Sequence, residues 1–244
     1  MVVALIFSPI ALTFIASHHD VIGFSSASAS DFALTTRRLV VTVAPGLISA
    51  STTETGTVSV QLKDNATGNP APAPSNVQVV LTSSNTSVVD IVYPNSNPVI
   101  TIPAGSWYTS VPIHGGGLAG KANITASAQG YLKGSSSVVA EHVTETPNQL
   151  GIYFATDTLM PNNVDYSNAV VVALQYRASN GTIFPAINTG SNVTVYARSS
   201  NNATMFVDTA PRNITPNTTN VAFDIASTLA SGRASITALL SLSE

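Results

Sequence analysis

Few side chains in this sequence have the types and spacing that catalysis or metal binding requires. His18 and His19 stand before Asp20, and imidazole and carboxylate groups bind metals. Adjacent residues of an extended strand point to opposite faces, however, and no third ligand motif accompanies them. His114 precedes three glycines without the Lys-Ser/Thr pair of a phosphate-binding loop, so we expect a turn between two strands there. We predict no catalytic residue, no metal site, no cofactor site and no enzymatic activity.

Three further residues could have a chemical role. Trp107 and Tyr108 could stack on a sugar ring, but aromatic residues between IPAGS and TSVPI are more typical of the edge of a packed sandwich. Lys121 could form an isopeptide bond to an asparagine. Its counterpart later in the chain is Arg233, which cannot form that bond. We therefore expect the two aromatic residues in the core and no such crosslink.

The asparagines carry the clearest chemical signal. Eight of them lie in Asn-x-Ser/Thr sequons, which accept N-linked glycans on chains that cross a membrane. These are Asn65, Asn85, Asn123, Asn180, Asn192, Asn202, Asn213 and Asn217. Only 9% of the residues are charged, against about 25% in typical soluble proteins, and glycans would supply the hydration that the missing charges do not. These features predict an extracellular, cell-surface glycoprotein.

Composition narrows the remaining function classes. The chain has 244 residues, of which 44% are hydrophobic, and this is enough for two domains with their own cores. A net charge of -3 without a basic stripe argues against a nucleic-acid partner. The absence of cysteine excludes a disulfide framework and a thiol nucleophile.

The chain contains an internal duplication. GKANITA at 120–126 returns as GRASITA at 232–238, and SNVQVVLTSSN at 75–85 returns as SNVTVYARSSN at 191–201. LVVTVAP at 39–45 matches LGIYFAT at 150–156 in the same way. The offset stays between 111 and 116 throughout. We predict an N-terminal extension at 1–36, a first domain at 37–146 and a second domain at 147–244.

Each repeat reads as a β-sandwich. Short runs rich in Val, Ile, Thr and Tyr alternate with polar residues and are separated by clusters of Gly, Pro, Asn or Ser. About seven strands in about 100 residues is the immunoglobulin-like pattern, although the Cys and Trp marks of antibody domains are absent. The predicted fold is all-β, with two tandem immunoglobulin-like sandwiches.

The second repeat stops one strand early. In the first repeat, the strand at 122–128 is followed by a turn and by a final strand at 135–143, whereas the matching strand at 234–242 has no successor. A sandwich without its last strand exposes an apolar trough and a row of unpaired backbone groups. We place this acceptor groove at Ile236, Ala238 and Leu240.

The first 17 residues are the predicted occupant of that groove. With a period of two, one face of MVVALIFSPIALTFIAS is apolar, and Pro9 requires an edge or a break in pairing. The donor residues on this face are Val2, Ala4, Ile6, Ile10, Leu12 and Phe14. Burying five large side chains gives roughly 8–15 kcal/mol as an upper bound, before the entropy of ordering is subtracted. Because such contacts run head to tail, they generate filaments when they do not close.

The same N-terminal run has two other interpretations. Followed by SASAS at 26–30, it resembles a secretory signal peptide, although no Lys or Arg precedes it. In that case the fallback donor is 31–41. A transmembrane anchor is less favoured, because Ser8, Pro9 and Thr13 interrupt the run.

Two sandwiches, a long apolar N-terminal extension, a truncated second repeat and many sequons together resemble the subunits of the archaeal thread filaments of the Sulfolobales. The resemblance implies a glycosylated extracellular filament joined by donor-strand exchange between copies of the chain, in an acidic habitat where carboxylates lose their charge. Adhesion to cells or surfaces is compatible with it. Two other classes stay open: a cell-surface adhesin or S-layer-associated binding module with a cleaved signal peptide, and a secreted hydrolase or carbohydrate-binding accessory.

Overall fold

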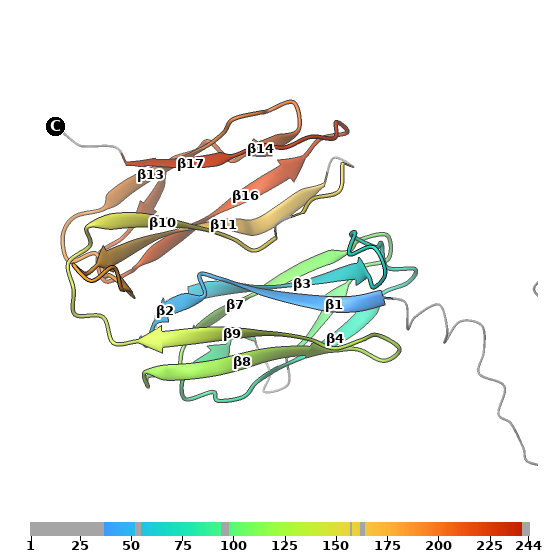
Figure 1. Ribbon diagram of the computed structural model, residues 1–244, viewed down its shortest axis with the longest axis horizontal. Helices are drawn as coiled ribbons and strands as arrows, with labels where there is room; N and C mark the ends of the chain where they lie inside the picture. The colour runs from blue at the N-terminus through green and yellow to red at the C-terminus, as the bar shows by residue number, and fades with distance from the viewer. Residues whose placement is uncertain (1–36, 52–54, 94–97, 157, 162–163, 241–244) are drawn as a thin grey trace, which may run out of the picture.

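The computed structural model describes residues 37–51, 55–93, 98–156, 158–161 and 164–240. Every regular element in these ranges is a β-strand, and the strands form two sandwiches stacked one on the other (Figure 1). This confirms the all-β fold with two tandem immunoglobulin-like sandwiches.

Within the described residues, the first sandwich contains nine strands, two more than the sequence pattern predicts. One sheet has the order β1-β3-β7-β5, and the other has the order β2-β9-β8-β4-β6. Their bounds are β1 Arg37–Ala44, β2 Leu47–Ser49, β3 Thr55–Asp64, β4 Val77–Ser83, β5 Val89–Ile91, β6 Val99–Ile102, β7 Tyr108–Gly115, β8 Gly120–Ser127 and β9 Gly134–Glu141. The extra strands are the short β2 and β5, which are too brief for alternation to reveal them.

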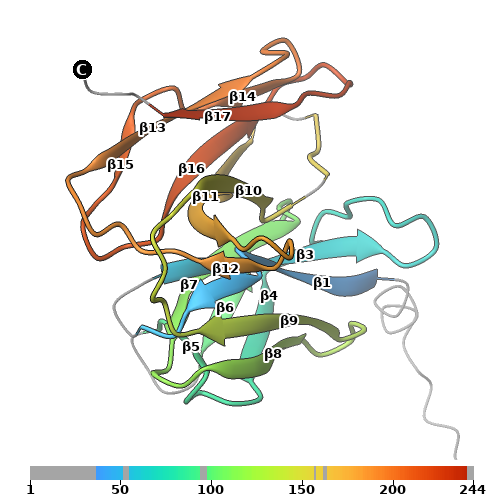
Figure 2. The ribbon, with the colours of Figure 1, turned by 60° about the vertical axis from the view of Figure 1, so that its left-hand side comes forward.

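The described part of the second sandwich contains eight strands. One sheet has the order β10-β11-β16-β14, with β12 added to β11, and the other has the order β15-β13-β17. Their bounds are β10 Gln149–Phe154, β11 Asp165–Arg177, β12 Ile183–Pro185, β13 Val193–Ser199, β14 Met205–Val207, β15 Arg212–Ile214, β16 Asn220–Ser227 and β17 Ile236–Leu240. Figure 2 shows β13, β15 and β17 on the side of this sandwich that faces away from the first.

The duplication is visible in individual hydrogen bonds. The amide of Ser84 donates to the carbonyl of Asn123 at 2.9 Å, and the amide of Ser200 donates to the carbonyl of Ser235 at the same distance. Ser84 and Ser200 stand 116 positions apart in the chain, and Asn123 and Ser235 stand 112 apart, both within the offset that the sequence predicts. The two repeats therefore fold alike.

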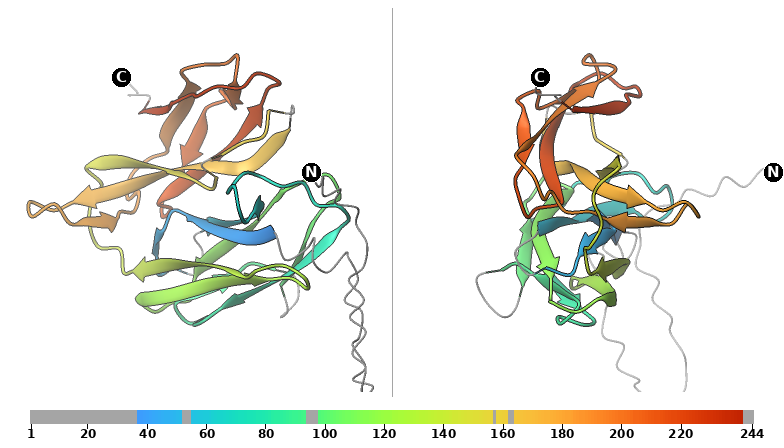
Figure 3. Two further views of the ribbon diagram at one scale, coloured as in Figure 1. Left: turned by 45° about the vertical axis from the view of Figure 1, so that its right-hand side comes forward. Right: turned by 90° about the vertical axis from the view of Figure 1, so that its left-hand side faces the viewer.

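Outer sheet faces, which are normally solvated in a sandwich, are buried between the two sandwiches. Ser59 and Gln61 point outward from β3, yet both are buried and both donate to the carbonyl of Ala155, Gln61 at 3.0 Å. On the facing strand β11, Val171 and Ala173 are buried on the outer side. The continuous apolar run in β11 is thus the signature of a strand covered on both faces. Figure 3 shows the two sandwiches pressed together along this face in both views.

Three aromatic rings anchor this contact. Trp107 is buried, and its indole N–H donates to the hydroxyl oxygen of Tyr166 at 3.1 Å. Tyr108 meets Tyr166 edge to face, with ring centroids 5.3 Å apart, and its hydroxyl donates to the carbonyl of Ser167 at 3.2 Å. Burial raises the pKa of Tyr108 to about 12. The prediction that Trp107 and Tyr108 lie in the core is confirmed, and they also join the two sandwiches.

Two sequence predictions are wrong in detail. His114 does not lie in a turn, because it belongs to β7 and pairs with Thr55 on β3 and with Asp90 on β5. The fallback donor at 31–41 overlaps β1, in which Leu39 and Val41 already fill the core of their own sandwich. These two residues cannot also fill a neighbour.

Asp208 carries a local charge interaction. The guanidinium of Arg212 donates to its carboxylate at 2.7 Å, and this bond, together with the amide of Ala210, lowers the pKa of Asp208. A carboxyl with a lowered native pKa stabilises the fold above its unfolded pKa, and this contribution disappears as the pH falls through the native value.

We expect Tyr166→Phe to lower the free energy of unfolding by about 1–3 kcal/mol, because the buried Trp107 N–H and the Met160 amide lose their shared acceptor. Chemical denaturation measures this loss. Tyr196→Phe, on the outer face of β13, is the matched control and should change little. Equal effects of the two substitutions would contradict the role assigned to Tyr166.

We expect Asp208→Asn to lower the unfolding free energy by about 0.2–1 kcal/mol at pH 7, the range for exposed ion pairs. The difference from the natural chain should vanish in acid, below the native pKa of Asp208. Thermal unfolding across this pH range measures it, and a difference that persists unchanged in acid would refute the assignment.

Candidate functional site

The candidate site is the sheet edge at which the two sandwiches differ. In the first sandwich β9 lies between β2 and β8, parallel to β2 and antiparallel to β8. In the second sandwich β17 takes the place of β8, and it pairs with β13 in the register that joins β8 to β4. Within the described ranges, no strand pairs with the other edge of β17.

No strand among the described residues takes the place of β9 in the second sandwich, and the facing strand β10 is uncovered there. Val43 of β1 is 8% exposed beneath β9, whereas its counterpart Phe154 is 43% exposed. Phe154 pairs with Val170, which is fully buried, so both side chains face the interior of the sandwich. Leu150 and Ile152, the other inward residues of β10, are half-buried. The interior of the second sandwich therefore stays open along β10.

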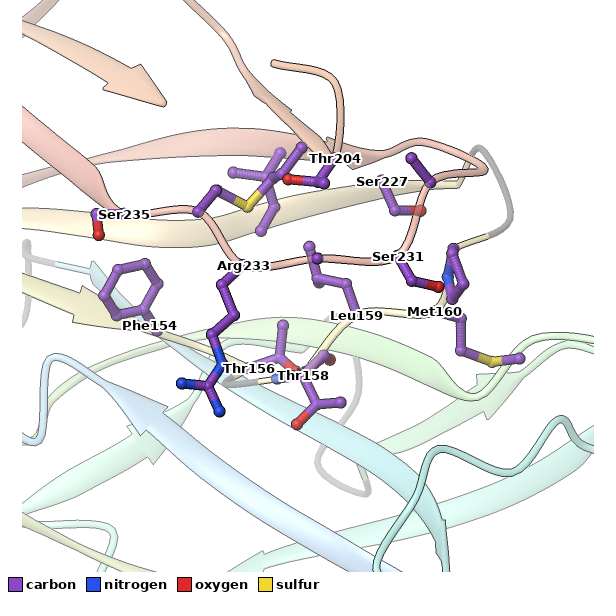
Figure 4. Close-up of a pocket in the computed structure, with 16 residues that line it drawn as sticks. Phe154, Thr156, Thr158, Leu159, Met160, Thr204, Ser227, Ser231, Arg233 and Ser235 are labelled. Atoms are coloured by element: carbon purple, nitrogen blue, oxygen red, sulfur yellow. Dashed lines mark hydrogen bonds between the residues drawn. The ribbon is translucent and has the colours of Figure 1, made fainter. Parts of the chain in front are cut away.

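A cleft of about 650 Å³ lies at this opening (Figure 4). One wall contains Thr158, Leu159 and Met160, which correspond by repeat alignment to β2 of the first sandwich. The opposite wall contains residues 232–235, which correspond to the start of β8. In the first sandwich, β9 fills the space between these two segments. The cleft is thus the place that a ninth strand occupies in the first repeat.

In the part of the chain that the structure describes, the main chain along the cleft also lacks a partner strand. The amide of Ser200, which directly follows β13, donates to the carbonyl of Ser235. Main-chain groups that point toward β13 therefore belong to Ser235 and to every second residue after it, Thr237 and Leu239. Backbone groups of a strand alternate in direction, so those of Ile236 and Ala238 point to the open edge. The site thus combines an apolar cavity with an unpaired strand edge.

The structure brings the three predicted acceptor residues together on β17. Ile236 is buried, Ala238 is half-buried and Leu240 is 44% exposed, and all three share the inward face of the strand. Exposure therefore increases toward the end of β17. The six predicted donor residues, from Val2 to Phe14, and His18, His19 and Asp20 lie outside the described residues.

The sequence pattern did not predict the residues that line the cleft opposite β17. Phe154, Leu159 and Met160 supply the apolar wall, and Arg233 lies at its rim (Figure 4). The repeat alignment contains the signal for the first two, because Phe154 and Leu159 stand where Val43 and Ile48 are buried next to β9.

The wall of the cleft that corresponds to β2 differs in one respect from its counterpart in the first sandwich. There, Ala50 donates its amide to the carbonyl of Glu141 in β9 at 2.8 Å. Its counterpart is Pro161, which has no amide hydrogen, and the amide of Met160 already donates to the hydroxyl oxygen of Tyr166 at 3.2 Å. A strand in the cleft could therefore form main-chain hydrogen bonds mainly with β17.

All eight sequon asparagines are exposed, in turns or on outward positions of strands. Asn123 lies on β8, and its counterpart on the open side of the second sandwich is Ser235, which is not part of a sequon. The strand segment that borders the cleft therefore contains no glycosylation signal.

Other kinds of site have little support in the part of the chain that the structure describes. It contains no cluster of three or more His, Cys, Asp or Glu residues that could hold a metal ion. It also contains no helix with the length and hydropathy needed to cross a membrane.

No protein-family model matches the chain, and no curated protein matches it. Among solved structures it is similar to domains 5–6 of the S-layer protein SbsC, with 19% identity, a TM-score of 0.44 and coverage of 84% of this chain and 92% of that one. It is also similar to the D0-D1 domain of intimin, with 15% identity, a TM-score of 0.30 and coverage of 82% and 90%. For invasin, a bacterial integrin-binding protein, the identity is 14% and the TM-score 0.34, and the match covers 83% of this chain but 36% of invasin. Likenesses at this level assign no function to the chain.

We expect hydrogen exchange to alternate along β17 in the monomeric chain. The amides of Ile236 and Ala238 should exchange roughly 2- to 12-fold faster than those of Thr237 and Leu239, which corresponds to one net hydrogen bond of about 0.5–1.5 kcal/mol. NMR-detected exchange measures the four rates. The amides of Ile124 and Ala126 are the internal control, because β9 covers their edge in the first sandwich. Uniform protection along β17 would mean that its edge is already paired.

Proposed function

We propose that the protein is a structural subunit of an extracellular, glycosylated filament, in which residues 1–17 of one copy complete the second sandwich of the next. One observation carries the proposal: the cleft lies where β9 lies in the first sandwich, between the same two segments of the repeat. An extended apolar segment is the occupant that such a space requires.

The chemistry of the cleft matches the composition of the N-terminal segment. Its walls include Phe154, Leu159, Met160 and Ile225, so it favours apolar side chains. Each large apolar side chain buried there contributes about 1.5–3 kcal/mol, before the entropy of ordering is subtracted. Each main-chain bond to the edge of β17 adds about 0.5–1.5 kcal/mol net. Peptides that add a strand to an open sheet in this way are a known mode of recognition.

One donor and one acceptor on each chain make the contact heterologous. Contacts of this kind form open filaments when the rotation between copies does not close a ring. The buried contact between the two sandwiches makes each subunit a stiff unit, since Ser59, Gln61, Trp107 and Tyr108 all bond across it. A stiff subunit that carries one donor segment and one acceptor groove is suited to linear polymerisation.

The surface chemistry supports an extracellular location. All eight sequon asparagines are exposed, and five of them lie in the second sandwich. The chain has 9% charged residues, so N-linked glycans together with hydroxyl and amide side chains would keep the polymer hydrated, including in acid, where carboxylates are protonated. The partners in this proposal are further copies of the chain, with neighbouring cells or surfaces as further contacts.

The second candidate is a cell-surface adhesin or S-layer-associated binding module. It is favoured by the apolar run followed by SASAS, which also fits a cleaved signal peptide. In that case residues 1–30 are absent from the mature protein, and the purified chain is a folded monomer.

We expect deletion of residues 1–17 to abolish filaments, which negative-stain electron microscopy and size-exclusion chromatography would detect. In the full-length chain, Leu12→Asp should have the same effect, because it places a charge in the apolar cleft. Thr13→Asp is the matched control, because this residue lies on the other face of the donor strand, and it should leave filaments intact.

Filaments of normal length after the deletion would exclude residues 1–17 as the donor. A natural chain that remains monomeric at high concentration with residues 1–17 present would instead favour the adhesin.

A further inference from the structure

We propose that N-linked glycans are attached to the folded chain at Asn85 and Asn180, and that the fold makes the sequon of Asn217 inaccessible. This inference rests on the glycosylated surface in the proposed function and does not depend on the donor strand. Each sequon has two ends, the asparagine and the hydroxyl residue two positions later, and the structure shows which of these ends an enzyme can reach.

The reaction sets the requirement. An oligosaccharyltransferase joins the asparagine Nδ2 to the anomeric carbon of a sugar that is carried on a lipid phosphate. The bond from that carbon to the phosphate oxygen breaks, the electron pair leaves with the phosphate, and Nδ2 loses one proton to a base of the enzyme. Nothing is oxidised or reduced. The enzyme must therefore contact both Nδ2 and the hydroxyl residue that defines the sequon.

Asn85 and Asn180 share one local conformation. The amide of Ser87 donates to Oδ1 of Asn85 at 3.1 Å, and the amide of Thr182 donates to Oδ1 of Asn180 at 3.0 Å. Only the oxygen of a carboxamide accepts from an N–H, so these bonds fix which end of each side chain faces the turn. In both residues the reacting Nδ2 has no hydrogen-bond partner among the described residues.

The hydroxyl ends of these two sequons are open as well. Ser87 and Thr182 are exposed, and neither hydroxyl has a hydrogen-bond partner in the part of the chain that the structure describes. Asn180 lies in the turn between β11 and β12, in which the amide of Ala178 donates to the carbonyl of Thr182 at 2.9 Å and residues 179–184 are all exposed. An enzyme can therefore reach both ends of each sequon without unfolding the chain.

The sequon of Asn217 has one open end and one buried end. Asn217 is exposed, but Thr219 is 2% exposed and its carbonyl accepts from the amide of Leu174 at 2.6 Å. The carbonyl of Thr218 accepts from the amide of Asn188 at 2.9 Å. Thr219 directly precedes β16, which pairs with β11 in the middle of its sheet. Exposing its hydroxyl would require these two strands to separate.

The other five sequons already use one end in a hydrogen bond. Four of them donate their hydroxyl group within the fold, and the fifth accepts through its asparagine. The hydroxyls of Thr67, Thr125, Thr194 and Thr204 donate to Asp64, Ser135, Asn213 and the carbonyl of Asn201, so that the sequons of Asn65, Asn123, Asn192, Asn202 and Asn213 are engaged. Asn85 and Asn180 are thus the sequons with both ends open.

Glycans at these two positions are compatible with the acceptor groove. Neither the turn at 84–88 nor the turn at 178–182 contributes a residue to the cleft. Sugars on Asn85 and Asn180 would therefore hydrate the surface and leave the groove accessible to a strand.

Glycopeptide mass spectrometry of the natural full-length chain tests the assignment without any substitution. We expect sugar on Asn85 and Asn180 and an unmodified Asn217. In the same cells, Asn85→Gln and Asn180→Gln should each reduce the mass of the intact chain by one glycan.

A second measurement tests whether the fold is the cause. Membranes of the producing cells, with their lipid-linked oligosaccharide, are offered a synthetic peptide of residues 212–222 and the folded full-length chain made in cells that lack N-glycosylation. The peptide should accept sugar at Asn217. In the folded chain, modification of Asn217 should be at least about tenfold slower than modification of Asn180, because it has to wait for local opening.

The outcomes separate this inference from the proposed function. Sugar on Asn217 at the level of Asn180, or an unmodified Asn85 or Asn180 on a chain that carries sugar elsewhere, would overturn the inference alone. A peptide that stays unmodified at Asn217 would show that its sequence, and not the fold, prevents the reaction, which also overturns it. A natural chain without sugar at any sequon would overturn the glycosylated surface together with this inference, and would leave polymerisation through residues 1–17 standing.

Discussion

The structure depends on one constraint. Each sheet of a sandwich must cover the apolar face of the other, and the backbone groups along its edges must find hydrogen-bond partners. The first sandwich meets this constraint with β9, which covers Leu39, Val41 and Val43 and pairs with two neighbours. The second has the counterpart residues Leu150, Ile152 and Phe154 on β10, and no strand among the described residues lies over them. The half-open interior, the cleft and the unpaired edge of β17 all follow from that one difference, and they need no separate explanation.

The contact between the sandwiches is the second determinant of the architecture. Sheet faces that carry Ser and Gln are suited to water, yet here they meet an apolar strand and a carbonyl group from the other half of the chain. The side chains of Ser59 and Gln61 satisfy the carbonyl of Ala155, which would otherwise be buried without a donor. The rings of Trp107, Tyr108 and Tyr166 also pack edge to face in this contact. The two repeats therefore act as one body, not as two domains on a flexible linker.

The sequence was sufficient to predict the features that repeat or alternate. Alternation predicted the sandwiches, and the comparison of GKANITA with GRASITA located β17, whose outer edge has no partner strand among the described residues. The contact between the sandwiches was not foreseen, although the apolar run in β11 marks a strand buried on both sides. His114 was misplaced because the following glycines suggest a turn, whereas Gly115 still belongs to β7, where a side chain would lie 2.4 Å from the carbonyl oxygen of Ser49. Neither the cavity volume nor Met160 and Pro161 as its second wall could be read from spacing, because both depend on how the loop after β10 packs.

The position of Ala155 has a mechanical consequence. It directly follows Phe154, so the residue that faces the cleft and the residue that is bonded to the first sandwich are neighbours in the chain. Tension applied to a strand held in the cleft would reach the first sandwich across a single peptide unit. Because such a strand would lie alongside β17, the pull would load its hydrogen bonds in shear, all at once, instead of opening them one after another.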